Sequence, residues 1–415
     1  MVEALSDDGA GSQVLGDPEG RFLPLGLLTV ALVLGMSTWF SATAVIPQLA
    51  EAWGLSATSQ AWLTISVVLG FVIGALVSSA FNIADRFRPQ VVMLIGAAGA
   101  GFANLGLIWI DDALVGILLR LTTGFFLAGV YPPSFKLIST WFRHGRGMAL
   151  GMLAAGIIVG NALPHLANAL GGVDWRNVIY ATSIMSIIGG SIAYLVRDGP
   201  FPFPESAFDP RQVGLVFSNR GVRLASIGYF GHMWELFAMA AWFLVFFRAH
   251  LVAVGQDPLP FAAFITFAVI AMGSVGSWLG GLIADRWGRT KFTITMLAIS
   301  GACSITIGLL FDGATWPIVV IGLIWGLTVV ADSAQFSAMV TETGDQSYVG
   351  TALTMQMAIG FTISAATIWI VPIIEQVVTW RWAFSILAIG PAVGVLAMLR
   401  LRRLPEARLI AGGLG

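Results

Sequence analysis

Cysteine, lysine and charge in general are scarce in this chain of 415 residues. It has one cysteine, Cys303, two lysines, and only 10% charged residues. A single cysteine excludes a disulfide framework and a thiolate metal cluster, and a small buried hydrophobe is the common role of such a residue. The formal net charge of −1 argues against a nucleic-acid partner, because neutralising phosphates requires a basic surface.

Motifs for cofactor and metal chemistry are missing as well. No G-x-x-x-x-G-K-[ST] sequence is present, so ATP hydrolysis by this chain is not expected. The four histidines and the cysteine show no clustered ligand spacing. We therefore expect no cofactor, no metal site and no enzymatic activity.

Long apolar segments are what the sequence does contain. Hydrophobic residues make up 57% of the chain and the mean hydropathy is +0.86. A helix needs about 20 apolar residues to cross a bilayer, and no backbone polar group can stay unpaired there. The sequence thus predicts an all-α membrane protein with twelve transmembrane helices. The predicted spans are residues 24–48, 60–81, 90–110, 114–137, 147–170, 176–196, 224–247, 261–283, 292–311, 316–340, 349–372 and 382–400.

The polar segments between the spans predict the domain organisation and the orientation. Arginines concentrate on the side that holds both termini, which the positive-inside rule assigns to the cytoplasm. Arginine-rich, lysine-poor composition with much Ala and Gly suggests the inner (plasma) membrane of a bacterium, and we expect a monomer. The predicted parts are a cytoplasmic tail (1–23) that is not a cleaved signal, a six-helix bundle (24–197), a cytoplasmic linker (198–223), a second six-helix bundle (224–402) and a cytoplasmic tail (403–415).

An internal repeat divides the spans into two equal halves. The pentapeptide IADRF at residues 83–87 returns as IADRW at residues 283–287, in both cases after the second span of a half. The pair Trp175 and Arg176 likewise returns as Trp380 and Arg381 before the last span. Two pseudo-symmetric bundles related by an axis along the membrane normal are a standard transporter plan, with the substrate site at their interface.

These residues resemble a known family, the major facilitator superfamily. Residues 281–291, GLIADRWGRTK, match its loop pattern G-x-x-x-D-R-x-G-R-x-K, and Arg120 with Gly124 matches the R-x-x-x-G of its fourth helix. The resemblance implies transport by alternating access between two six-helix bundles. The first copy of the loop departs from the pattern at Phe81 and Arg88, where glycines are expected.

The same resemblance implies a gate at the cytoplasmic loops. Carboxylates of Asp85 and Asp285 would cap a neighbouring helix and pair with arginines in one conformation only. A static clamp of the loop is the alternative interpretation. The gating residues implied are Asp85, Arg86, Asp285, Arg286, Gly288 and Arg289.

Five ionisable residues lie inside the apolar spans: Arg120, His165, His232, Glu235 and Asp332. A charge near the bilayer centre costs about 2.5–3.5 kcal/mol or more, so each is a candidate for function. Arg120 can hold an oxyanion through its planar guanidinium, or it can be a structural partner of Glu235 or Asp332. His165 is either a ligand or a polar lining residue.

Glu235 and His232, three residues apart on one helix face, are the candidates for proton coupling. A satisfied hydrogen bond between helices is the alternative for Glu235. For Asp332, coupling, gating and structural pairing all remain open. Trp39, Asn161 and Trp234 are further candidates for contact with substrate, although packing is the more common role of such aromatic residues.

The predicted function is secondary active transport of a small organic anion, coupled to protons as a symporter in the lipid bilayer. Gly160 and Asn161 resemble part of the nitrate-porter signature, but the second and eighth spans lack the arginines of nitrate porters. A proton-coupled drug or metabolite efflux antiporter is one alternative. A receptor that keeps a transporter fold without moving a solute is another.

Overall fold

The computed structural model describes residues 18–81, 83–142, 146–170, 174–201, 216–256, 260–345 and 349–415. Within these ranges the secondary structure is helical, without strands. Most of the predicted tail at 1–23 and of the predicted linker at 198–223 lies outside the described residues, as does the side chain of Asp85. The prediction of an all-helical chain is confirmed.

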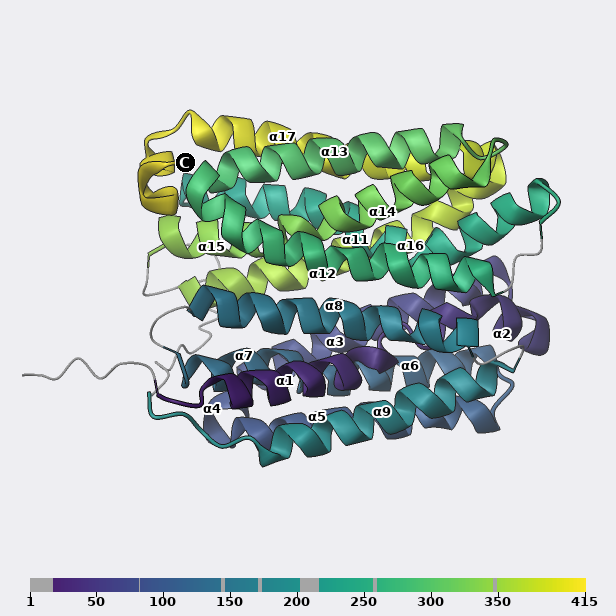
Figure 1. Cartoon of the computed structure of the whole chain (residues 1–415), viewed down its shortest axis with the longest axis horizontal. Helices are drawn as coiled ribbons and strands as arrows, with labels where there is room; N and C mark the ends of the chain where they lie inside the picture. Colours follow the sequence, from purple (N-terminus) through teal and green to yellow (C-terminus); the bar gives the residue numbers. More distant parts are fainter. Residues whose placement is uncertain are drawn as a thin grey trace, which may run out of the picture.

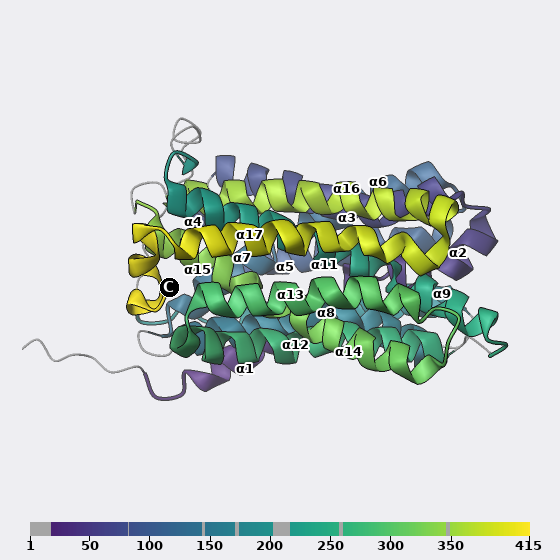
Figure 2. The same cartoon turned by 90° about the horizontal axis from the view of Figure 1, so that it is seen from above.

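The helices form two groups that lie side by side (Figures 1 and 2). The first group contains α1 (Phe22–Gly35), η1 (Met36–Thr38), η2 (Thr43–Val45), α2 (Ile46–Trp53), α3 (Ala57–Ala80), α4 (Ile83–Arg86), α5 (Pro89–Leu105), η3 (Gly106–Trp109), α6 (Ala113–Leu127), α7 (Tyr131–Ser139), α8 (Arg146–Leu170) and α9 (Trp175–Leu195). The second contains α11 (Arg220–Ala253), α12 (Phe261–Trp287), α13 (Arg289–Leu309), α14 (Thr315–Ala331), α15 (Ser333–Thr343), α16 (Val349–Ala383), η5 (Phe384–Ala388), α17 (Ile389–Arg402) and η6 (Pro405–Gly413).

The number of membrane-spanning segments is consistent with twelve. In the described ranges, ten helical segments are long and apolar enough to cross a bilayer, and the bent pair Phe22–Thr38 with Thr43–Trp53 adds one. One of the ten, Val349–Arg402, has 54 residues, far more than the roughly 20 needed for a single crossing. It contains α16 and α17, which are separate rods in Figure 1.

Three predicted spans are broken helices. The first is interrupted between α1 and α2, the fourth between α6 and α7, and the tenth at Asp332 between α14 and α15. Pro132 and Pro133, in the first turn of α7, lack the N–H groups that a continuous helix would use. Pro47 likewise lies in the first turn of α2 after the first break, whereas α15 after the tenth-span break has no proline. The first break is held by a buried arginine, as described below.

Glycines allow helices to pack with their backbones in contact at equivalent places in the two halves. A Cβ at Gly124 of α6 would collide with the carbonyl oxygen of Val67 in α3. A Cβ at Gly326 of α14 would collide in the same way with Val269 in α12. The glycine of the R-x-x-x-G pattern therefore fixes the close approach that places α6, and Arg120 on it, against its neighbours.

The two groups of helices touch through α3 with α16 and through α8 with α12. We call the end of the molecule that carries α4, α15 and η6 the loop face, and the opposite end, near α2, the far face (Figure 1). At the far face, Ala57 and Ala61 of α3 line one pocket together with Trp369 and Ile373 of α16. The halves therefore meet at that end.

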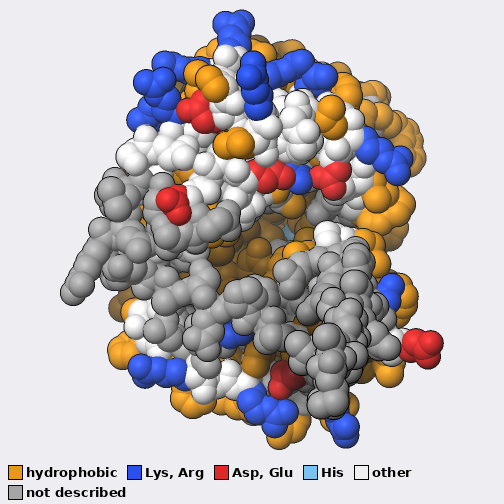
Figure 3. Space-filling view, turned by 90° about the vertical axis from the view of Figure 1, so that its left-hand side faces the viewer, with side chains coloured by type: hydrophobic (Ala, Val, Ile, Leu, Met, Phe, Trp, Pro, Cys, Tyr) orange, Lys and Arg blue, Asp and Glu red, His pale blue; other side chains and the backbone are white. Residues whose placement is uncertain are grey.

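The loop face is hollowed. Figure 3 looks onto it and shows a central depression floored by hydrophobic side chains, with acidic and basic side chains above it on the rim. A molecule whose halves meet at one face and that is hollowed at the other (Figure 3) has the form of one end state of alternating access.

Candidate transport site

Arg120 holds the break in the first span. Its side chain is fully buried on α6. Nη1 donates to the carbonyl oxygen of Thr38 (2.9 Å), Oγ of Ser41 (3.0 Å) and Oδ1 of Asn104 (3.0 Å), and Nη2 donates to the carbonyl oxygen of Trp39. These carbonyls lie where the helix is interrupted, so they need donors from elsewhere. The guanidinium replaces the missing backbone N–H at the Trp39 carbonyl, and at the Thr38 carbonyl it adds to the donors that Ser41 supplies.

Asn104 extends this contact into a buried polar network. Its Nδ2 donates to Oγ1 of Thr182 (3.2 Å) and Oγ of Ser183 (2.9 Å), while Ser41 donates to its Oδ1 (2.5 Å). The network joins the first, third, fourth and sixth spans. Within the described part of the chain, none of the ion pairs involves Arg120. Its positive charge therefore faces neutral groups and not Glu235 or Asp332.

Polar atoms without partners gather beside this break. Within the described ranges, Oγ1 of Thr38, Nε1 of Trp39, Oδ1 of Asn161 and both ring nitrogens of His165 have no hydrogen-bond partner, although all are buried. Asn161 and His165 are four residues apart on α8, hence on one helix face. The flanking Asn168 of α8 donates to the carbonyl oxygen of Ala44 in the break (2.7 Å).

Buried polar atoms are almost always paired. Unpaired ones on two packed elements make this part of the chain a candidate site. Three of the residues predicted to bind substrate, Trp39, Asn161 and His165, have such unpaired atoms, and α8 packs against η1 and η2 at the break. Arg120 binds the same break.

Trp39 also belongs to an aromatic cluster that links the two halves. Its ring lies 5.2 Å from Phe71 of its own half, and 5.7 and 6.0 Å from Phe237 and Phe361 of the other. Trp234, the other predicted aromatic ligand, has its indole nitrogen bound to the carbonyl oxygen of Ile386 (3.1 Å). Trp234 is therefore not part of the unpaired set.

Glu235 is buried in the second half and both of its oxygens accept hydrogen bonds. Ser300 Oγ donates to Oε2 (2.8 Å) and Trp325 Nε1 donates to Oε1 (2.8 Å). Ser300 Oγ also lies 3.2 Å from the carbonyl oxygen of Leu297. A hydroxyl can donate or accept, whereas an indole N–H can only donate. Ser300 can thus serve both a charged and a protonated Glu235.

His232 pairs with Asp332 and not with Glu235, which differs from the sequence interpretation. Nδ1 of His232 lies 3.0 Å from Oδ1 of Asp332, and both side chains are 1% exposed. In the described part of the chain, His232 Nε2 and Asp332 Oδ2 have no partner. The aromatic rings of Tyr229 and Phe336 pack on the imidazole. Asp332 interrupts the tenth span, so the second half also has a polar break.

The predicted gating residues lie at the loop face. Arg289 binds Asp285 of the same half (Nη1 to Oδ1, 2.9 Å), and Gly288 between them has a φ of 95°, which favours glycine. Arg86 and Arg286 are exposed. Asp285 does not cap α13, whose N-cap residue Gly288 makes no side-chain cap bond.

Sequence reasoning missed several partners in these clusters. Asn104 and Ser300 are uncharged and common in membrane helices, so no pattern marks them. Trp325 is one of the aromatic residues that could shape a cavity, but nothing in the sequence pairs it with Glu235. The sequence does carry a signal for Glu342, which also binds Arg289 (Nη2 to Oε1, 3.0 Å): it is a charged residue just beyond the predicted tenth span.

These features define a class of protein, a multi-pass membrane transporter with two helical halves around a polar site. The chain belongs to the Major Facilitator Superfamily, which matches residues 27–367. The resemblance inferred from the loop motif is therefore confirmed, and the protein is a transporter and not an enzyme.

Similar sequences include proteins named as transporters, two of them for a particular solute. The chain is 24% identical over 314 residues to an "MFS-type transporter 1" of Ophiocordyceps sp. (strain BCC 1869), covering 74% of this chain and 67% of the relative. It is 21% identical over 298 residues to a "Gallate transporter" of Pseudomonas putida (64% and 66% covered). It is 22% identical over 287 residues to a "Probable sulfoacetate transporter" of Cupriavidus necator (strain ATCC 17699) (64% and 65% covered).

Two solved structures share the fold. A bacterial homolog of the human lysosomal transporter Spinster, inward-facing and unoccupied, gives a TM-score of 0.74 at 15% identity, covering 94% of this chain and all of that one. A D-xylose-proton symporter gives 0.72 at 16% identity, covering 94% and 99%.

Two buried histidines test whether the unpaired ring nitrogens of His165 belong to a binding site. His250 is buried like His165, but its ring nitrogens contact the carbonyl oxygen of Phe311 (2.6 Å) and Oγ1 of Thr315 (3.1 Å). His250→Leu should lower the free energy of unfolding by about 1–3 kcal/mol, because it removes the contact to the carbonyl oxygen of Phe311, whereas Thr315 Oγ1 keeps its bond to Gln256. His165→Leu should leave it unchanged or raise it. Thermal unfolding in detergent, followed by tryptophan fluorescence, measures both.

Equal destabilisation by the two substitutions would show that His165 is a structural residue. A stable His165→Leu protein that no longer transports would support a ligand role.

Proposed function

We propose that this protein is a secondary transporter that moves a small organic anion together with protons. The observation that carries the proposal is the buried Arg120, whose described partners are all neutral, next to the unpaired atoms of Trp39, Asn161 and His165. A buried charge without a counter-charge is unfavourable. An anionic substrate would provide the missing charge.

Arg120 acts on the anion through its charge more than through direct contact. Both of its Nη atoms are occupied by the first span and, within the described residues, only Nε has no partner. The bidentate contact expected from the sequence is therefore not available in this conformation. An anion about 6 Å away would still gain roughly 3 kcal/mol at an effective dielectric constant of about 20. Trp39 N–H and the imidazole of His165 are then the groups that donate to it.

The proton is carried by the carboxyl groups of the second half. A protonated Glu235 can donate to Ser300, whose hydroxyl then turns to the carbonyl oxygen of Leu297. Closing a dry cavity over a charged carboxylate is penalised, whereas closing it over a neutral acid is not. Asp332, paired with His232, is a second candidate for the proton.

Relatives support the same substrate class and the same driving ion. Transporters named for gallate and sulfoacetate are among the similar sequences, and a proton symporter shares the fold.

Both ends of the described chain lie at the loop face (Figure 1), which we assign to the cytoplasm from the distribution of arginines.

A panel of solutes tests the substrate class. Purified protein in liposomes should exchange a small carboxylate or sulfonate, with radiolabelled gallate and sulfoacetate as the first probes. Gallate and its methyl ester form a matched pair, because they share the ring and differ in charge. We expect the acid, and not the ester, to compete for exchange. Exchange of only neutral D-xylose or of a cationic drug would contradict the anion proposal.

A further inference from the structure

Residues 405–415 fold back onto the loop face of the second half. The segment begins with η6 (Pro405–Gly413), which contacts α15 and α17. Ile410 is fully buried in the main hydrophobic core, whereas the neighbouring Leu409 is 59% exposed. Ile410 therefore anchors the segment through its side chain.

Two backbone hydrogen bonds join this segment to the gate. The N–H of Ala411 donates to Oε2 of Glu342 at the end of α15 (3.2 Å), and the N–H of Thr290 in the first turn of α13 donates to the carbonyl oxygen of Gly415 (3.1 Å). The first N–H groups of a helix have no partner inside the helix. The segment thus supplies an acceptor to α13 and a donor to Glu342.

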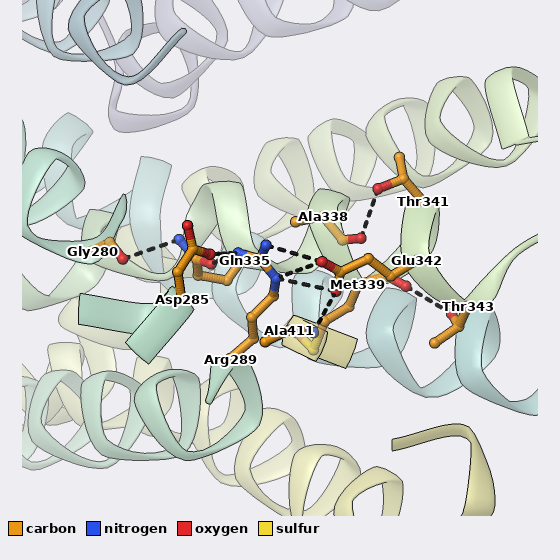
Figure 4. A network of polar contacts seen from close by, with 10 residues as sticks. All are labelled: Gly280, Asp285, Arg289, Gln335, Ala338, Met339, Thr341, Glu342, Thr343 and Ala411. Atoms are coloured by element: carbon orange, nitrogen blue, oxygen red, sulfur yellow. Dashed lines mark hydrogen bonds and ion pairs between the residues drawn. The ribbon is translucent and has the colours of Figure 1, made fainter. Parts of the chain in front are cut away.

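Glu342 in turn holds the central arginine of the gate loop. Nε of Arg289 lies 3.1 Å from each oxygen of Glu342, and Nη1 donates to Oε1 of Gln335 (2.6 Å). Arg289 also binds Asp285 at 2.9 Å. Figure 4 shows this chain of contacts running from Ala411 through Glu342 and Arg289 to Asp285. Two carboxylate oxygens that accept from one guanidinium hold it in a fixed position and also balance its positive charge.

We propose that residues 405–415 are an intramolecular clamp that stabilises the conformation hollowed at the loop face. The clamp fixes Glu342, Glu342 fixes Arg289, and Arg289 keeps Asp285 on its own half. Closing the loop face requires contacts between the two halves. When the Asp285 carboxylate is paired with Arg289, its negative charge is partly neutralised, and it attracts positive groups of the first half less strongly. Release of the segment frees this network and favours closure.

The clamp predicts a conformational shift for a substitution at one residue and none for a substitution at its neighbour. Ile410→Ser removes the buried anchor, and Leu409→Ser makes a similar polar change at an exposed site in the same segment. Nitroxide labels at Phe81→Cys and Leu282→Cys, in a Cys303→Ser background, report the distance between the halves at the loop face. Double electron–electron resonance without substrate should show a several-fold increase in the ratio of short to long distances for Ile410→Ser, and none for Leu409→Ser.

Two further variants keep the test decisive if Ile410→Ser folds poorly. A chain shortened after Leu404 lacks the clamp, and Glu342→Gln keeps the shape but loses the charge that binds Arg289. Both should shift the distances in the same direction, and size-exclusion chromatography checks their folding. Unchanged distances in these folded variants, or the same shift in Leu409→Ser, would overturn the clamp. Because no substrate is used, this outcome is independent of the proposed substrate.

Discussion

Glu235→Gln is expected to abolish proton-driven accumulation of substrate while preserving counterflow, in which both sides of the membrane are loaded with substrate. Glutamine mimics the protonated acid: its amide can donate to Ser300 and its oxygen can accept from Trp325, which occupy the two carboxylate oxygens in the native protein. The fold should therefore be retained. The carrier then has no proton to release at Glu235, so a pH gradient no longer drives transport.

The sign of the pH effect follows from the same geometry. In the native protein, acidifying the side from which substrate enters should raise accumulation, because protonation neutralises a carboxylate that must pass through a dry cavity. The Gln variant should give the same counterflow rate across the pH range. Glu375→Gln, a half-buried carboxylate near the far end of α16, is the matched control and should behave like the native protein.

A Glu235→Gln protein that still concentrates substrate under a pH gradient would show that Glu235 is not the coupling group. Asp332→Asn would then be the next variant, because its carboxylate is equally buried and lacks a partner for Oδ2 among the described residues.

Arg120→Gln is expected to lower both the free energy of unfolding and the affinity for the anion. This effect should be second in size only to that of Glu235→Gln. The carbonyl oxygen of Trp39 would lose its donor, at about 1–3 kcal/mol for a buried group left unpaired. The carbonyl oxygen of Thr38 would lose its charged donor but keep the hydroxyl and the N–H of Ser41. The loss of roughly 3 kcal/mol of charge interaction with an anion corresponds to about a hundredfold weaker binding. Gallate titrated into the purified protein by calorimetry, together with thermal unfolding, measures both effects.

Arg120→Lys separates charge from position. Lysine keeps the positive charge but has a compact ammonium instead of a planar fork, so it cannot reach the same set of acceptors. We expect it to lose stability while keeping part of the affinity. Arg176→Gln, at a half-exposed arginine near the start of α9, is the control and should change neither. Retained affinity in both Arg120 variants would mean that the charge does not contribute to recognition.

Much of the fold was predictable because the length of each apolar segment can be read from the local sequence. Each crossing requires its own run of apolar residues, so the spans and the internal repeat can be found without knowing what they contact. The breaks could not be predicted in this way. The first span looks continuous in sequence, and its interruption is held by the Arg120 guanidinium, which comes from a different span.

The candidate site was predictable only in its charged members. Arg120, Glu235, His232 and Asp332 stand out because charge is costly in an apolar span. Their pairing depends on helix packing, which is why Asp332 and not Glu235 faces His232. The uncharged partners carry no such signal, and neither does the position of residues 405–415 against the gate.

The most direct test of the account is substrate uptake into liposomes with a pH difference imposed and the membrane potential clamped at zero by potassium and valinomycin. Under these conditions the proton gradient is the only driving force. The account predicts that labelled anion accumulates inside above its external concentration, and that collapsing the pH gradient with a protonophore returns it to equilibrium. Uptake that only equilibrates, with or without the pH difference, would contradict proton coupling.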